Sequence, residues 1–269
     1  MSAPVSPADL LDLAVATARE AAGLITRERG SAAADVGVKS SPTDVVTAVD
    51  TASEALITRR LLEARPDDGL LGEEGADRAG SSGVRWVVDP IDGTVNFLYG
   101  LRGWAVSIAA QVDGVTVAGA VLDVPTGDLF TATAGGGAFL STREAPDPVR
   151  LTGNRPGSLG QTLVATGFGY RVEQRRAQGA VVAQLLTEVR DIRRQGCASL
   201  DLCSVAAGRV DAYYELDLKP WDHAAGALVA AEAGLVVTGL PGRPFADPMA
   251  VAVPETVAGP LLELLDRLH

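Results

Sequence analysis

WVVDPIDGTVNF, residues 86–97, is the part of the chain from which the other assignments follow. Residues 86–88 are a short apolar run of strand-forming residues, which predicts a buried strand. We expect this strand to end at Asp89, because Pro90 lacks an amide hydrogen and keeps the residue before it extended. The chain therefore predicts a carboxylate held rigidly at the end of a strand.

A second carboxylate, Asp92, follows three residues later and precedes Gly93 and Thr94. Glycine allows a ligand to approach the backbone closely, and the amides of Gly93 and Thr94 are placed to face an anion. Rigid carboxylates beside amides suit a hard cation that carries a phosphate. The alternative is an ordinary turn, because Asp, Pro and Gly are common turn residues.

Composition narrows the classes of function. The chain has 269 residues, 47% of them hydrophobic, and a net charge of −11, so it can bury a sizeable core. No basic block is present, and we expect no nucleic-acid partner. Only His223 and His269 are histidines, so a metal ion would be held by oxygen ligands.

Cysteine content and hydropathy bear on location. Cys197 and Cys203 do not form a disulfide framework, which suits a reducing cytosol. No apolar run approaches the roughly 18 residues of a membrane helix, and the first residues lack a basic signal region. We therefore expect a cytoplasmic protein with no membrane partner.

Helix and strand patterns alternate along the chain, which predicts an α/β or α+β fold with layered sheets. Asp113-Gly114 between two apolar runs predicts a two-residue hairpin. The proline-rich and glycine-rich segment 141–158 is the best candidate for a boundary between lobes. We expect helices over 6–29, 45–61, 172–189, 199–207, 221–233 and 261–268, and strands over 70–71, 86–88, 104–108, 115–117, 128–133, 163–166, 210–216 and 235–238.

Acidic residues gather where these elements begin or end. Asp222 falls at a helix start, where its ordinary role is to cap the helix, and Glu73 and Glu74 lie between glycines, where the alternative is a solvated turn. Crowded carboxylates would repel one another and take up protons unless a divalent cation were bound among them. The acids in question are Glu73, Glu74, Asp89, Asp92 and Asp222.

Together these motifs resemble the inositol monophosphatase family, and they span most of the chain in that family's order. The resemblance rests on KSSPTDVVTAVD (39–50), GEEG (72–75), WVVDPIDGTVNF (86–97) and KPWDHAAGALVAAEAG (219–234). The segment GCASLDLCSVAAGRVDAYYE (196–215) resembles the bacterial inositol monophosphatases.

The resemblance implies a layered αβαβα sandwich of the sugar-phosphatase type, formed by residues 1–269 as one unit. An N-terminal lobe of about 1–143 would carry the metal site, and a C-terminal lobe of about 144–269 the substrate site. It also implies magnesium as cofactor, two to three ions per active site, sensitivity to lithium, and a homodimer.

The resemblance assigns the metal ligands by position. Glu73, Asp89 and the carbonyl of Ile91 would bind one magnesium. Asp89, Asp92 and Asp222 would bind a second, and Glu73 with water molecules a weaker third. These oxygen ligands agree with the coordination that magnesium prefers.

The resemblance also assigns the catalytic residues. Thr94 and Asp50 would orient the attacking water, with Glu74 and Thr47 in support. The amides of Gly93 and Thr94 would hold the phosphate. In-line attack on a phosphate ester needs such an oriented water.

Substrate contacts follow in the same way. Asp92, the backbone of Ala198, and Glu215 would contact the sugar-like alcohol, and Lys39 would belong to a mobile metal-binding loop. The expected reaction is hydrolysis of a small polyol phosphate, first of all myo-inositol 1-phosphate. Alternatives are the same chemistry on histidinol phosphate, adenosine 3',5'-bisphosphate or fructose 1,6-bisphosphate, or a regulatory binding protein without turnover.

Overall fold

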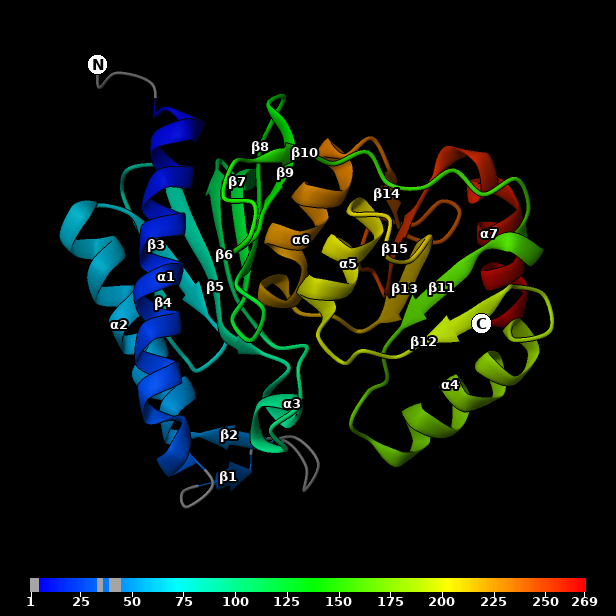
Figure 1. Cartoon of the computed structure of the whole chain (residues 1–269), viewed down its shortest axis with the longest axis horizontal. Coiled ribbons are helices and arrows are strands. Elements are labelled where there is room, and N and C mark those ends of the chain that lie inside the picture. The colour runs from blue at the N-terminus through cyan, green and yellow to red at the C-terminus, as the bar shows by residue number, and fades with distance from the viewer. Residues whose placement is uncertain (1–4, 33–35, 39–44) are drawn as a thin grey trace.

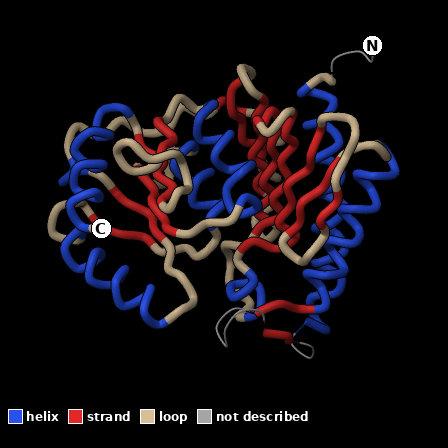
Figure 2. Tube along the Cα trace, turned by 180° about the vertical axis from the view of Figure 1, so that it is seen from behind, coloured by secondary structure: helices blue, strands red, loops and turns tan. Residues whose placement is uncertain are grey.

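The computed structural model describes residues 5–32, 36–38 and 45–269. Five layers follow one another across the molecule, helices alternating with sheets (Figure 1). Seen from behind, the strands form two separate groups, with helices between them and on both outer sides (Figure 2). The expected αβαβα sandwich is therefore confirmed. The helices are α1 (Pro7–Ala32), α2 (Ala48–Ala64), α3 (Thr94–Leu98), α4 (Val172–Leu185), α5 (Ala198–Ala206), α6 (Pro220–Glu232) and α7 (Glu255–Leu268).

The larger sheet has the strand order β10-β9-β8-β7-β6-β5-β3-β4. It is antiparallel except between β3 and β5, which run parallel. Helices α1 and α2 cover its outer face (Figure 1). Its strands are β3 (Gly69–Gly72), β4 (Asp77–Arg78), β5 (Val84–Asp92), β6 (Ala105–Val112), β7 (Val115–Asp123), β8 (Asp128–Thr133), β9 (Gly137–Ser141) and β10 (Val149–Arg150).

The smaller sheet has the order β12-β11-β13-β15-β14, with β12, β11 and β13 parallel and the other pairs antiparallel. Helices α4 and α7 lie on its outer side (Figure 1). Its strands are β11 (Leu163–Thr166), β12 (Asp191–Arg193), β13 (Ala212–Leu216), β14 (Val236–Thr238) and β15 (Met249–Val253). A separate pair, β1 (Val36–Val38) and β2 (Val45–Thr47), and a 3-10 turn, η1 (Leu159–Gln161), complete the described elements.

Helices α5 and α6 fill the space between the two sheets (Figure 1). One buried apolar cluster joins side chains of the larger sheet, such as Val87 and Phe130, to Ala225 of α6 and Tyr213 of the smaller sheet. Strand β10, at residues 149–150, still pairs with β9 in the larger sheet. The chain therefore passes from the larger to the smaller sheet between residues 150 and 163. The division into lobes at residues 143 and 144 stays a prediction.

The hairpin prediction is confirmed. Val112 pairs with Val115, and both intervening residues have positive φ, 50° at Asp113 and 82° at Gly114. That combination matches the right-handed twist of the flanking strands.

Several expected boundaries are wrong. Strand β5 does not end at Asp89 but continues through Pro90 to Asp92. The register against β6 shifts between Asp89 and Asp92, so no ladder hydrogen bond needs an amide donor at Pro90. The strand therefore tolerates the proline. Helix α7 begins at Glu255, six residues earlier than expected. Residues 45–47, expected to open a helix, form β2 instead.

No described helix combines the length and the apolar character that crossing a membrane requires.

Candidate active site

The start of α2 ties two of the predicted catalytic residues together. The Thr47 amide donates to Asp50 Oδ2 at 2.9 Å, the Thr47 hydroxyl donates to the same oxygen, and the Asp50 amide donates to Thr47 Oγ1 at 3.3 Å. This is a reciprocal capping box, and both side chains are buried. The other carboxylate oxygen of Asp50, Oδ1, contacts a residue from a distant part of the chain.

That contact is Thr94, 44 residues further along the chain. Its hydroxyl lies 3.2 Å from Asp50 Oδ1 and 3.0 Å from the carbonyl oxygen of Ile91, so it can donate to either acceptor. Thr94 opens the short helix α3, directly after Gly93. The structure thus brings Thr47, Asp50, Ile91 and Thr94 into one hydrogen-bonded group.

Gly93 is where the backbone needs glycine. Its φ of 88° is left-handed, and a Cβ there would lie 2.8 Å from the carbonyl oxygen of Gly103 and 3.2 Å from Cys197 Cβ. The chain turns tightly at this point, which places Thr94 beside the end of β5.

Asp89 is the most deeply buried of the acids predicted to bind metal, with 1% of its surface exposed. Its Oδ1 accepts the Ile91 amide at 3.0 Å. Burial raises the pKa of Asp89 well above its usual range, and the negative charges of Glu73, Asp92 and Asp222 raise it further. These four acids therefore lie close enough to oppose one another's ionisation.

Asp92 is held by the beginning of α5. The Ser199 amide donates to Asp92 Oδ2 at 2.7 Å. Burial raises the pKa of Asp92, while hydrogen bonds from Ser199, Cys197 and the backbone of Ala198 lower it. The structure thus places Ala198, a predicted substrate contact, beside Asp92.

Asp222 keeps the local role that its position predicts. Its Oδ2 accepts the Lys219 amide at 2.6 Å in the first turn of α6. Burial raises its pKa well above the usual range, and the charges of Asp92, Glu73 and Glu215 add to the shift, offset in part by the Lys219 hydrogen bond. Asp222 is therefore both a helix-start acid and a member of the acidic cluster.

Glu215 lies at the end of β13 and is half-buried. The hydroxyl of Tyr213 donates to its Oε2 at 2.7 Å. Burial raises the pKa of Glu215 to about 7, and the charge of Asp92 acts in the same direction. Glu215 thus joins the same group of acids from the opposite sheet.

The donor set fits a hard divalent cation by its chemistry. Glu73, Asp89, Asp92 and Asp222 supply only oxygen atoms, are buried or half-buried, and repel one another when ionised. Within residues 5–32, 36–38 and 45–269, however, no three His, Cys, Asp or Glu side chains lie close enough together to form a metal-binding site as they stand. The metal-ligand roles stay predictions, and Lys39 lies outside the described residues.

Sequence reasoning missed two residues that hold this group in place. Glu54 accepts backbone amides of the turn that carries Glu74, and Ser199 donates to Asp92. The sequence carries one signal for Glu54: it follows Asp50 by four residues, so the two side chains lie on the same face of the helix. The Ser199 contact spans 107 residues, and no local pattern indicates it.

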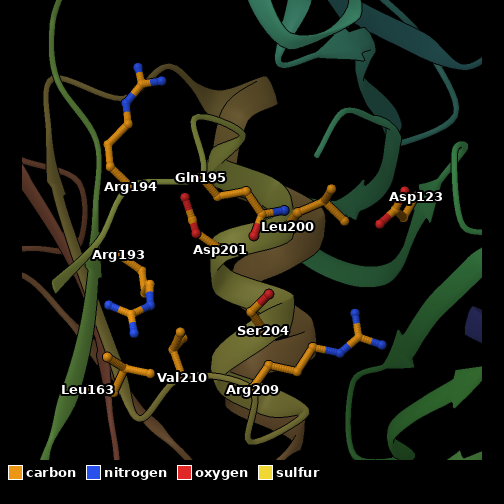
Figure 3. Close-up of a pocket in the computed structure, with 10 residues that line it drawn as sticks. All are labelled: Asp123, Leu163, Arg193, Arg194, Gln195, Leu200, Asp201, Ser204, Arg209 and Val210. Carbon is orange, nitrogen blue, oxygen red and sulfur yellow. The ribbon is translucent and has the colours of Figure 1, made fainter. Parts of the chain in front are cut away.

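A cavity of about 300 Å³ lies along α5 (Figure 3). Asp201 is buried in its wall, and Asp201 Oδ2 lacks a hydrogen-bond partner in the described part of the chain. Arg193 pairs with Asp191 at 2.5 Å. None of the residues that the sequence predicted for the site lines this cavity. The lining is Asp123, Leu163, Arg193, Arg194, Gln195, Leu200, Asp201, Ser204, Arg209 and Val210.

Comparison with known proteins agrees with the fold and the motifs. The sequence model of the inositol monophosphatase family matches residues 6–267. Inositol-1-monophosphatase SuhB of Mycobacterium tuberculosis is 47% identical over 278 residues, which cover 98% of this chain and 95% of the relative. A protein of Escherichia coli named Nus factor SuhB is 40% identical over 235 residues, 87% of this chain and 86% of that protein.

A solved structure is similar over the same extent. Mycobacterium tuberculosis SuhB superposes with a TM-score of 0.85 at 42% sequence identity, covering 99% of each chain. Because the family match spans nearly the whole sequence and the fold agrees, this chain belongs to the inositol monophosphatase family and is a phosphoric monoester hydrolase.

Proposed function

We propose that this enzyme hydrolyses a small polyol phosphate monoester, first of all myo-inositol 1-phosphate, to the free alcohol and phosphate with the help of Mg²⁺. The observation that carries the proposal is the contact between Asp50 Oδ1 and the Thr94 hydroxyl, 3.2 Å apart. It joins two distant segments beside a group of buried acids, where a phosphate ester would need an oriented water.

The chain's own residues supply that orientation. When the Thr94 hydroxyl donates to Asp50, its oxygen lone pairs can accept a hydrogen from water, which directs the water's own lone pair toward the phosphorus. Thr47 holds the other oxygen of Asp50, so the carboxylate cannot rotate freely. Glu74 lies in the neighbouring turn, and the family resemblance assigns it a supporting role.

The phosphate would lie at the turn after β5. The left-handed Gly93 turns the backbone there, and the amides of Gly93 and Thr94 are the proposed donors to the phosphate oxygens. Glycine also allows the phosphate to approach without meeting a side chain.

Magnesium would be held by Glu73, Asp89, Asp92, Asp222 and the carbonyl of Ile91, as two to three ions. When bound, it would neutralise charge on the phosphoryl group and lower the pKa of water. The raised pKa values of Asp89 and Asp222 support this role, because a cation would stabilise the ionised form of these buried groups.

The alcohol would lie between the two sheets. Asp92, the backbone of Ala198, and Glu215 are the proposed contacts to its hydroxyl groups. Ser199 and Tyr213 hold the two carboxylates at 2.7 Å each, which limits the hydroxyl geometry that they can accept.

A panel of phosphate esters tests the proposal. Purified enzyme is assayed for phosphate release from myo-inositol 1-phosphate, histidinol phosphate, adenosine 3',5'-bisphosphate and fructose 1,6-bisphosphate. We expect the highest kcat/KM with myo-inositol 1-phosphate, dependence on Mg²⁺, and inhibition by Li⁺ and by excess Ca²⁺, which takes more ligands at longer distances. Full activity in chelator would contradict the metal role, and preference for another ester would reassign the substrate.

Other expectations remain proposals of the same kind. They are the homodimer, the cytoplasmic location, and the lack of a nucleic-acid partner. The name of the Escherichia coli relative bears on the alternative of a regulatory binding role. The complete set of acids in this chain favours turnover.

A further inference from the structure

Helix α2 carries a second buried acid, Glu54, one turn after Asp50. Glu54 has 5% of its surface exposed, and Asp50 has none. Residues four positions apart lie on the same face of a helix. The face of α2 that presents Asp50 to Thr94 therefore also presents Glu54 to the next part of the protein.

That part is the turn after β3. Glu54 Oε2 accepts the Glu74 amide at 2.8 Å, and Oε1 accepts the Ala76 amide at 2.9 Å. A buried carboxylate is costly unless it is hydrogen-bonded, and here both of its oxygens are satisfied by backbone donors.

The turn is shaped to receive this carboxylate. A Cβ on Gly72 would lie 2.1 Å from Glu54 Oε2, so only glycine leaves room. The Gly72 amide donates to the Ala76 carbonyl at 2.7 Å, and the Glu73 amide donates to the Val88 carbonyl of β5 at 3.2 Å. Residues 72–76 are thus held between α2 on one side and β5 on the other.

We propose that Glu54 is a positioning residue of the active site: its carboxylate holds the Glu73–Glu74 turn at a fixed distance from the Asp50–Thr94 pair. This inference rests on the proposed function of that site. Because Asp50 and Glu54 belong to one helix, the water-orienting group and the turn with the proposed metal ligand move as one body. Glu54 itself touches no reacting atom.

The chain contains a matched control for this arrangement. Glu232, at the end of α6, accepts the Gly135 amide at 2.7 Å and the Gly137 amide at 2.8 Å. It is the same carboxylate clamp on two backbone amides of a turn. The turn that it holds joins β8 to β9 and carries none of the proposed site residues.

The experiment compares Glu54→Gln with Glu232→Gln. Glutamine keeps the shape, but its NH₂ group faces one of the two backbone donors, so one hydrogen bond is lost in each variant. We expect Glu54→Gln to weaken Mg²⁺ binding in calorimetry and to lower kcat/KM, each by about 10- to 100-fold, as for other residues that orient metal ligands. We expect Glu232→Gln to keep both values of the parent.

Amide hydrogen exchange of the metal-free proteins locates the effect. It should accelerate at Glu74 and Ala76 in Glu54→Gln, and at Gly135 and Gly137 in Glu232→Gln. If Glu54 served stability alone, as Glu232 does, both variants would have a lower melting temperature and an unchanged Mg²⁺ affinity. If Glu54→Gln does not fold, Gly72→Ala is the second variant. Its Cβ would lie 2.1 Å from Glu54 Oε2, too close for the carboxylate to keep its place, so we expect the same loss of affinity.

The outcomes separate the inference from the proposed function. An active parent with Glu54→Gln equal to it in kcat/KM and Mg²⁺ affinity would overturn the positioning role. A parent without phosphatase activity would overturn the proposed function, and Glu54 would then be judged on Mg²⁺ affinity alone. Equal affinity of the parent and the variant would again reject its role.

Discussion

Helices α2 and α6 begin with the same local arrangement but have different surroundings. In each, the amide of the residue before the helix donates to the acid three positions later: Thr47 to Asp50 at 2.9 Å, and Lys219 to Asp222 at 2.6 Å. Asp50 then meets a hydroxyl, that of Thr94. Asp222 meets other acids, and its burial, together with their charges, raises its pKa.

The difference shows that the helix cap does not determine the chemistry of the acid. A first-turn acid stabilises a helix wherever it occurs. What it can do beyond that depends on the groups that the fold places against its remaining oxygen. We therefore expect Asp50 to serve the orientation of water and Asp222 to serve the binding of metal, although sequence position alone treats them alike.

Asp50→Asn should separate the two roles with the largest effect. We expect kcat to fall by about 10²- to 10⁴-fold, the usual contribution of a positioned acid–base group, while the Mg²⁺ concentration for half-maximal activity stays near that of the parent. Steady-state kinetics over a magnesium titration measures both quantities. Asp9→Asn, at the exposed first turn of α1, is the matched control and should leave them unchanged. Rescue of Asp50→Asn by added magnesium would contradict the role.

Asp222→Asn should have a smaller effect of a different kind. We expect about 10- to 100-fold weaker activation by Mg²⁺, because one charged ligand becomes neutral, and a partial recovery of rate at high magnesium. The same titration measures it. A loss of kcat that no magnesium concentration relieves would show that Asp222 does not act through the metal.

Glu215→Gln extends the comparison to the acid from the opposite sheet. The pKa of Glu215 is raised from 4.5 to about 7, so the folded protein binds a proton more tightly there than the unfolded chain does. This contribution to stability is present below about pH 4.5 and is lost as the pH rises to about 7. Relative to Glu215→Gln, the metal-free parent should lose on the order of 1–3 kcal/mol over that range. Urea unfolding at several pH values measures it, and a constant difference would reject the shift.

The smallest expected effect concerns the caps themselves. Thr47→Ala removes a side-chain cap and should cost about 0.5–2 kcal/mol of unfolding free energy. Lys219 is exposed and makes no side-chain cap hydrogen bond, so Lys219→Ala should be nearly neutral. Thermal unfolding of the two variants compares them. Equal losses would mean that the Thr47 hydroxyl contributes nothing as a cap.

Local patterns predicted much of the fold. The hairpin at Asp113-Gly114 and the strand at 128–133 were assigned correctly, since turn chemistry and side-chain alternation are properties of adjacent residues. The predicted end of β5 came too early, because we took Pro90 to stop the strand. A proline stops a strand only where its missing amide hydrogen bond is needed, and the register shift against β6 removes that need. Strand β15 was not foreseen. It is completely buried and short, and its run of five residues has no polar alternation.

The candidate site divides in the same way. The acids beside turns could be identified in the sequence, and the family resemblance supplied their roles. Two residues that hold them, Ser199 and Glu54, could not be identified, because their contacts join distant segments: Ser199 reaches Asp92 across 107 residues, and Glu54 reaches the Glu74 amide across 20. Such contacts exist only once the helices have packed against the sheets.

The packing of α6 carries one more consequence. A Cβ on Gly119 of β7 would lie 3.0 Å from the Cα of Ala225, and one on Gly226 would lie 2.9 Å from the carbonyl of Ser199. Helix α6, which carries Asp222 in its first turn, is therefore packed closely against the sheet on one side and against α5 on the other. A single methyl group added at either glycine would push α6 away from its neighbour and would move Asp222 with it. Inherited variation at these two remote positions should therefore alter the proposed metal site without changing any residue that belongs to it.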